Sequence, residues 1–143
     1  MIYQANRITP ESRSVLSRPT DFLRCIDTLN PVDSERLYLF TLTKHHSLIQ
    51  KHLLAIGLIS NEIIKDIFRY VLYDKAAAFA LVRSGSELSP KPTEQERDLV
   101  TDLQTVCDIM EIELSDYLLI GAQECYSFEE NGELKDNDND IPF

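Results

Sequence analysis

The chain has 143 residues, 43% of them hydrophobic, and a formal charge of −10 at pH 7. This size predicts one globular domain with a single core, and no stretch approaches the roughly 18 uninterrupted apolar residues that a membrane-spanning helix needs. The acidic balance argues against direct nucleic-acid binding, because proteins that bind nucleic acids neutralise phosphates with Lys and Arg.

The first third of the chain predicts an arm, a short helix and a β-hairpin. Residues 1–18 show no sustained periodicity, so we interpret them as an arm. Thr20 is typical of an N-cap, and the apolar residues behind it predict a short amphipathic helix that ends before Pro31. Two segments rich in apolar residues follow at 37–42 and 48–56, on either side of a polar turn. This pattern predicts two strands paired as a hairpin.

The middle of the chain predicts a helix, a central strand and a loop. Ser60 is a candidate N-cap for a helix with a wide apolar stripe that ends near Asp74. Residues 76–82 form a short continuous apolar run, which is typical of a strand covered on both faces. The glycine, prolines and serines of residues 83–92 predict a loop.

The last third predicts one long helix and two more strands. Thr93 followed by Glu96 matches a capping box, and the helix behind it should run to about Met110. Strands are expected at 117–121 and 125–128. The order strand, strand, helix, strand, helix, strand, strand predicts an α/β fold in which helices flank one mixed β-sheet.

The chain closes with Asp-Asn-Asp-Asn-Asp-Ile-Pro-Phe, which predicts a peptide ligand. Phe143 would carry an aromatic ring and a free carboxylate on one residue, so an apolar pocket rimmed by Lys or Arg could hold both. The acids would steer the peptide toward a basic surface, an attraction that salt weakens. The other interpretation is a solvated acidic tail that binds nothing. The residues expected to contact a partner are Asp136, Asp138, Asp140, Ile141, Pro142 and Phe143.

This closing sequence resembles the acidic tip of bacterial single-stranded-DNA-binding protein. The resemblance covers only the last eight residues, and its specific part is Asp-Ile-Pro-Phe, which has to sit at a carboxyl terminus. It implies as partners the proteins that read such tips, namely the chi subunit of the replicative clamp loader, repair helicases, exonucleases and primase.

A second resemblance concerns the body of the chain. Segments similar to the RadC-like branch of the JAB/MPN metalloprotease superfamily occur, in the order of that family, at residues 48–57, 76–78, 90–93, 112–121 and 126–128. The resemblance implies a three-layer, cytidine-deaminase-like architecture. It divides the chain into an N-terminal arm (1–18), a RadC-like JAB/MPN domain (19–130) and an acidic tail (131–143).

Active members of that family hold zinc with a His-x-His pair and an Asp, and a Glu from an earlier strand relays protons from the metal-bound water. The positions that match the His pair, a Ser and the Asp hold, in this order, Arg83, Gly85, Thr93 and Glu96. The upstream Glu falls near Lys51 or His52. Neither Arg83 nor Gly85 can ligate zinc, so the resemblance implies a domain without metal, cofactor or catalysis.

The alternative function is a RadC-like metal-dependent hydrolase with an altered site around Glu96, Thr93 and His52. A nucleic-acid-binding repair factor is a third candidate, which the acidic charge disfavours. The histidines at 45, 46 and 52 have no Cys or carboxylate at a recognised metal-ligand spacing, so surface or hairpin positions are favoured. The three widely spaced cysteines favour reduced core thiols over a disulfide framework or a nucleophile.

These features together predict a non-catalytic adaptor of DNA replication or repair, whose folded domain presents the tail to proteins that read the single-stranded-DNA-binding protein tip. A close variant is a two-faced scaffold, in which the domain also binds a second protein or forms a dimer. We expect a cytoplasmic protein that binds neither membranes nor nucleic acid directly, because the chain does not open with a basic-then-apolar signal pattern.

Overall fold

The computed structural model describes residues 15–25, 35–56, 62–87 and 89–134. Its elements follow the chain as α1 (Pro19–Leu23), β1 (Arg36–Leu42), β2 (Leu48–Ile56), α2 (Ile63–Tyr73), β3 (Ala78–Ser84), α3 (Glu94–Met110), β4 (Glu113–Ile120) and β5 (Cys125–Ser127). The five strands form one sheet in the order β2-β1-β3-β4-β5. The β3–β4 pair is parallel and the other pairs are antiparallel, so the predicted mixed sheet is confirmed.

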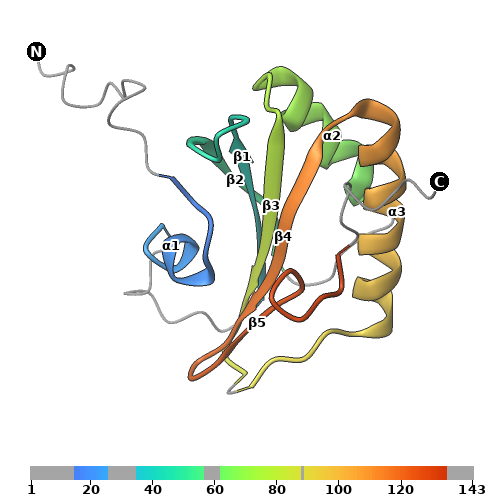
Figure 1. The fold of residues 1–143 in the computed structure, drawn as a ribbon. Helices are drawn as coiled ribbons and strands as arrows, with labels where there is room; N and C mark the ends of the chain where they lie inside the picture. Colours follow the sequence, from blue (N-terminus) through green and yellow to red (C-terminus); the bar gives the residue numbers. More distant parts are fainter. Residues whose placement is uncertain (1–14, 26–34, 57–61, 88, 135–143) are drawn as a thin grey trace, which may run out of the picture.

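The sheet is the middle of three layers (Figure 1). Helices α2 and α3 cover one face, and α1 lies against the other. Alternate residues of each strand serve the two cores: Leu37 and Leu39 of β1 pack under α2 and α3, whereas Tyr38 and Phe40 pack toward α1. Because both faces are covered, the inner strands are mostly apolar, as a buried sheet requires. The α/β fold with flanking helices is therefore confirmed.

The hairpin and the long helix match the predictions closely. β1 and β2 pair antiparallel, with Leu39 opposite His52. Helix α3 begins behind Thr93, which accepts the backbone N–H of Glu96, and the Glu96 side chain in turn accepts the N–H of Thr93. This is the predicted capping box, and it fixes the N-terminus of α3 beside the end of β3.

Two helix starts differ from the predictions. α1 begins at Pro19 with Arg18 as its N-cap, so the assignment of Thr20 as N-cap is wrong. The reason is the Asp21 carboxylate, which accepts the backbone N–H groups of Ser17 and Arg18 and closes the first turn two residues earlier. α1 ends at Leu23 with Arg24 as its C-cap, so the predicted helix up to Asn30 is too long. Glu62 occupies the N-cap of α2, and Ser60 lies outside the described residues.

Two strands are displaced from their predicted bounds. The strand expected at 76–82 spans Ala78–Ser84, because Ala76 still closes the end of α2 by donating its N–H to the Val71 carbonyl. Arg83 and Ser84, predicted to start a loop, are strand residues. β4 begins at Glu113, four residues before the predicted start, because its first residues pair with β3.

The end of the segment interpreted as an arm packs against the sheet. Leu16 is 1% exposed and its N–H donates to the His46 carbonyl at 2.8 Å, while Val15 forms an isolated bridge to Ser47. Residues 1–14 lie outside the described residues. Within the described ranges, every helix is too short or too polar to cross a membrane.

Candidate functional site

The candidate site lies where β3 ends beneath the N-terminus of α3. β3 is the central strand, and its last residues pair with β1 on one side and β4 on the other. Arg83 shares the face of Phe79 and Leu81, the face that α2 and α3 cover. The strand thus carries a cation into the layer between sheet and helices, where only 8% of its side chain is exposed.

Arg83 and Glu96 form a bidentate ion pair. Arg83 Nε donates to Glu96 Oε2 at 2.6 Å, and Nη2 donates to Glu96 Oε1 at 3.1 Å. The Glu96 side chain is 5% exposed, so the pair is shielded from solvent on both sides. Paired, parallel N–H···O bonds of this kind are about twice as strong as neutral hydrogen bonds and fix the relative orientation of both groups.

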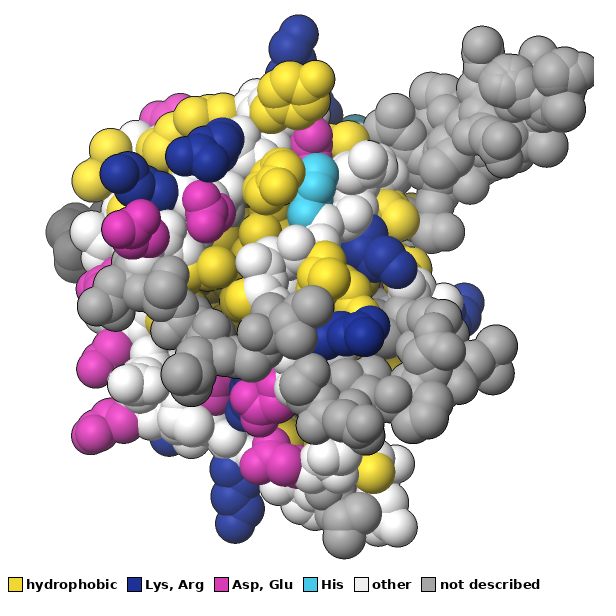
Figure 2. Space-filling model, turned by 180° about the vertical axis from the view of Figure 1, so that it is seen from behind, with side chains coloured by type: hydrophobic (Ala, Val, Ile, Leu, Met, Phe, Trp, Pro, Cys, Tyr) yellow, Lys and Arg dark blue, Asp and Glu magenta, His cyan; other side chains and the backbone are white. Residues whose placement is uncertain are grey.

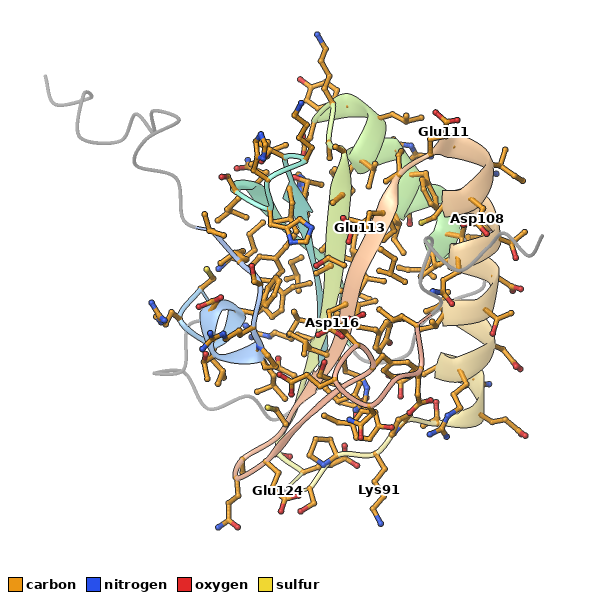
Figure 3. All side chains as sticks on the ribbon, in the orientation of Figure 1. Lys91, Asp108, Glu111, Glu113, Asp116 and Glu124 are labelled. Carbon is orange, nitrogen blue, oxygen red and sulfur yellow. The ribbon has the colours of Figure 1, made fainter. Side chains whose placement is uncertain are left out.

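Three further acceptors complete the surroundings of the guanidinium. Nη1 donates to Glu35 Oε2 at 2.9 Å and to Glu87 Oε1 at 3.3 Å, and Nη2 donates to the Lys91 carbonyl at 3.4 Å. Figure 3 shows the side chain of Lys91 pointing away from the domain, so this residue contributes only its backbone oxygen. We call the group of Arg83, Glu35, Glu87, Glu96 and the Lys91 carbonyl the Arg83 cage.

Glu96 is also held from behind by two hydroxyl residues. Tyr117 of β4 donates its hydroxyl to Glu96 Oε2 at 2.9 Å, and the Thr93 hydroxyl lies 3.3 Å from Glu96 Oε1. Each Glu96 oxygen thus accepts from Arg83 and from at least one other donor. Burial and then the negative charge of Glu96 raise the pKa of Tyr117, which keeps the hydroxyl protonated and able to donate.

The charge of Arg83 is stabilised by its acceptors. Burial acts to lower the pKa of the guanidinium, but the hydrogen bonds and charge of Glu96, followed by Glu35 and Glu87, outweigh it and raise that pKa. Arg83 therefore stays a cation at every pH at which the domain is folded.

The loop after β3 is held close to the end of β4. The N–H of Ala122 donates to the Glu87 carbonyl at 2.6 Å. At Gly121 a Cβ atom would collide with the same carbonyl and with the Pro90 ring, so only glycine permits this approach. At Gly85 an added Cβ would lie 3.2 Å from Glu35 Cγ. A larger side chain there would push against a member of the Arg83 cage.

His52 and Lys51 do not join this site. His52 lies on β2, and β1 separates that strand from β3. Its Nε2 lies 2.7 Å from Asp74 Oδ2, and its ring stacks on Tyr70 with 4.0 Å between the centroids. Lys51 Nζ donates to the Cys25 carbonyl at 2.8 Å. Of the predicted positions, the structure brings together Arg83, Thr93 and Glu96, with Gly85 at the margin.

Three residues of the site were missed by the sequence interpretation. Glu87 follows Arg83 by four positions, and that spacing of opposite charges was the one available signal. Tyr117 was assigned only to a strand, although its hydroxyl reaches Glu96. Glu35 pairs with a residue 48 positions away, and no local pattern indicates such a contact.

The residues of the Arg83 cage do not fit the zinc ion that the resemblance implies. A divalent cation in their midst would face the fixed positive charge of Arg83. Both oxygens of Glu96, the one residue at a matching ligand position that could bind metal, are already occupied by donors. Across the described ranges, no three His, Cys, Asp or Glu side chains are grouped so as to hold a metal ion.

A second buried carboxylate lies on the opposite face of the sheet. Asp116 of β4, labelled in Figure 3, accepts the Ser127 hydroxyl at 2.6 Å and the backbone N–H groups of Tyr117 and Glu129 at 2.7 and 3.0 Å. Burial raises the pKa of Asp116 to about 6, although these three hydrogen bonds oppose the shift. The contacts fasten β5 and the turn behind it, so we assign Asp116 a structural role.

The predicted peptide ligand, residues 136–143, lies outside the described residues. On the face shown in Figure 2, Lys and Arg side chains of the described residues are dispersed among acidic and apolar ones and form no continuous basic surface. This distribution agrees with the acidic net charge and gives no support to nucleic-acid binding at that face. The cysteines of the described residues, Cys25, Cys107 and Cys125, are all free. Cys107 is buried as predicted, but Cys125 is exposed because β5 is an edge strand, so the prediction of a core thiol is wrong there.

Residues 16–133 match the family model described as a RadC-like JAB domain, so the chain belongs to that family. The match begins at the buried Leu16 and ends at Glu133, and it includes the whole sheet and the Arg83 cage.

Three relatives illustrate the similarity. A UPF0758 protein of Haemophilus influenzae (strain 86-028NP) is 28% identical over 119 residues, which cover 72% of this chain and 54% of the relative. A UPF0758 protein of Clostridium perfringens (strain ATCC 13124) is 25% identical and covers 90% of this chain and 58% of its own length. A UPF0758 protein of Chlorobium chlorochromatii (strain CaD3) is 24% identical over a match that covers 93% of this chain and 63% of the relative. The chain thus spans little more than half the length of these relatives.

Proposed function

We propose that this protein is a non-catalytic adaptor of DNA replication or repair, in which a RadC-like JAB domain carries a peptide that docks on other proteins. The observation that carries the proposal is the closing sequence Asp140-Ile141-Pro142-Phe143 behind an acidic run. It resembles the tip that single-stranded-DNA-binding protein offers to replication and repair enzymes. The proposal requires Phe143 to be the last residue, because the free carboxylate is part of the ligand.

The binding mode follows from the chemistry of the tail. The Phe143 ring would enter an apolar pocket, and its carboxylate would meet an Arg or Lys at the rim. Ile141 and Pro142 would pack beside the ring, and proline would limit the conformations lost on binding. Asp136, Asp138 and Asp140 would face a basic border, so binding should weaken as salt is added.

The Arg83 cage supports the non-catalytic part of the proposal. Hydrolysis by this family's chemistry needs a metal-bound water and a carboxylate to take its proton. At the corresponding place, a buried guanidinium is paired with Glu96, which also accepts the Tyr117 hydroxyl. The domain would then act by presenting its tail and not by cleaving a substrate.

The partners are proposed from the resemblance of the tail. They are proteins that read the tip of single-stranded-DNA-binding protein: the chi subunit of the clamp loader, repair helicases, exonucleases or primase. The tail would compete with single-stranded-DNA-binding protein for one pocket. A second partner bound by the domain would make the protein a two-faced scaffold.

Affinity capture from a bacterial lysate tests the proposal. The bait is the full chain, and the matched control lacks only Phe143. We expect the full chain to enrich one or more tip-reading proteins at least tenfold over the control, since burial of a Phe side chain is worth about 1.5–3 kcal/mol. Equal capture by both baits would refute the role of the tail. Metal analysis that finds one equivalent of zinc in the purified protein, lost on Glu96→Gln, would refute the non-catalytic role of the domain.

A further inference from the structure

All three nitrogens of the Arg83 guanidinium have acceptors from the chain. Glu96 takes the edge formed by Nε and Nη2, Glu35 and Glu87 take Nη1, and the Lys91 carbonyl takes Nη2. The acceptors come from the segment before β1, the loop after β3 and the first turn of α3. These acceptors therefore contact the planar guanidinium of Arg83 along more than one of its edges.

We propose that Glu35, Glu87, Glu96 and the Lys91 carbonyl form a cation-binding site selective for guanidinium, and that Arg83 is its covalently attached occupant. This inference shares one premise with the proposed function, which is that the site binds no metal. It adds that the folded chain forms a site for an organic cation, guanidinium, where the family resemblance implies a zinc ion.

The arrangement of acceptors favours guanidinium over a metal ion. A metal of the size of zinc draws its ligands to about 2.0–2.3 Å around one point. Here the acceptors are distributed around a group several atoms wide, and no three carboxylates of the described residues converge on one point. Glu96 is fixed in the bidentate geometry by Thr93 and Tyr117, which orients it for a planar fork of donors.

The resident cation adds a link between parts of the chain that lie far apart in the sequence. Glu35 lies 48 residues before Arg83, and Glu96 lies 13 residues after it. Without the guanidinium, three carboxylates would repel one another at the N-terminus of α3. Arg83 therefore holds Glu87, the Lys91 carbonyl and the start of α3 against β3.

Chemical rescue tests this inference. In the full chain, Arg83→Ala removes the head group and leaves its space, while Arg97→Ala is the matched control. Arg97 also makes a two-point contact, to Glu133, but half of its side chain is exposed to solvent. Thermal unfolding is followed with guanidinium chloride from zero to about 100 mM, a range in which denaturation is slight. Sodium chloride at equal ionic strength and zinc chloride serve as comparisons.

We expect guanidinium to raise the Tm of Arg83→Ala by about 3 °C or more, with saturation, because the vacated site exists only in the folded state. The wild type and Arg97→Ala should show only a slight decrease. The inference is overturned if the Tm of Arg83→Ala falls in parallel with the wild type, or if zinc raises it and guanidinium does not.

A second variant covers the case in which Arg83→Ala does not fold at any guanidinium concentration. Arg83→Ala combined with Glu87→Gln removes one of the three repelling carboxylates and still leaves the space of the head group open, and the same criteria then apply to its Tm. Failure of the rescue would leave the adaptor proposal standing, because that proposal is tested by removing Phe143. Loss of tail binding would in turn leave the rescue unaffected.

Discussion

Arg83 and Glu96 pair two full charges whose side chains are 8% and 5% exposed. Burial removes most of the hydration of both ions, and this cost is offset only because each head group is hydrogen-bonded on several sides. Glu96 has Tyr117 and Thr93 in addition to Arg83. Removing either member of the pair leaves the other charge buried without its main partner.

Single substitutions in this pair should therefore be costly. We expect Arg83→Met and Glu96→Gln each to lower the free energy of unfolding by about 3–5 kcal/mol, and the double variant to lose much less than the sum. Urea denaturation of the four proteins measures this coupling. Additive effects, each below about 1 kcal/mol, would show that the ion pair contributes little.

Asp116 should make stability depend on pH. Burial raises its pKa to about 6 in the folded protein, so between the ordinary Asp value and about 6 the folded state binds the proton more tightly than the unfolded chain does. The stabilising contribution is complete at lower pH and is lost as pH rises through about 6. Asp116→Asn, which can still accept two backbone N–H groups, removes this dependence.

The measurement is the free energy of unfolding of the wild type minus that of Asp116→Asn. We expect this difference to fall by on the order of 2 kcal/mol from about pH 4 to pH 7. Asp108→Asn, at an exposed position on α3 (Figure 3), is the control and should show almost no such trend. A flat profile for Asp116→Asn relative to wild type would contradict the shifted pKa.

At the scale of the element, α3 shows how local sequence sets a boundary. Thr93→Ala removes the hydroxyl that accepts the Glu96 N–H, and should cost about 1 kcal/mol of unfolding free energy. Thr101→Ala is the matched control within the same helix, because that hydroxyl only bonds the Arg97 carbonyl one turn back. It should change stability by less than about 0.5 kcal/mol. Equal losses at both positions in denaturant unfolding would rule out a specific capping role.

The elements that could be predicted are those with local signals. The capping box of α3 and the β1–β2 hairpin rest on residues a few positions apart, and both were found. The bounds of β3 were misplaced because a charged residue at a buried strand end looks like a loop. Arg83 is held in the strand by Glu96, 13 positions later, and by Glu35, 48 positions earlier. The pairing of a buried cation with distant carboxylates depends on the tertiary fold, which no local sequence pattern encodes.

The candidate site was predictable to the same extent. Thr93 and Glu96 were placed correctly relative to Arg83 because only one loop separates the end of β3 from the first turn of α3. His52 was expected nearby, but its ring is engaged by Asp74 and Tyr70 on the far side of β1. Glu35 and Tyr117 come from separate elements, and only the folded chain brings them to the site.

At the scale of the whole molecule, the fold should be independent of divalent metal. The Arg83 cation is part of the chain, so chelation has nothing to remove from the Arg83 cage. We expect EDTA and added zinc chloride each to shift the Tm by less than about 1 °C, in contrast to domains whose folding is coupled to metal binding. A Tm lowered by EDTA and restored by zinc would contradict the account.

Half of the formal net negative charge lies near the end of the chain. Residues 129–143 contain six acids and one lysine, a charge of −5 out of −10. This concentration of negative charge at one end agrees better with the proposed adaptor, in which the tail is the ligand, than with a domain that binds nucleic acid through its surface. On this account the domain and the tail have separable roles, the first in folding and the second in recognition.

The most direct test of the adaptor proposal is competition for one purified tip-reading protein, such as the clamp-loader chi subunit. A labelled peptide with the tip sequence of single-stranded-DNA-binding protein is bound to it, and the full chain is titrated in while fluorescence anisotropy is followed. The account predicts displacement by the full chain, and at least tenfold weaker displacement when Phe143 is deleted or one Gly is appended behind it. Equal displacement by all three proteins, or none by the full chain across the panel of tip readers, would contradict it.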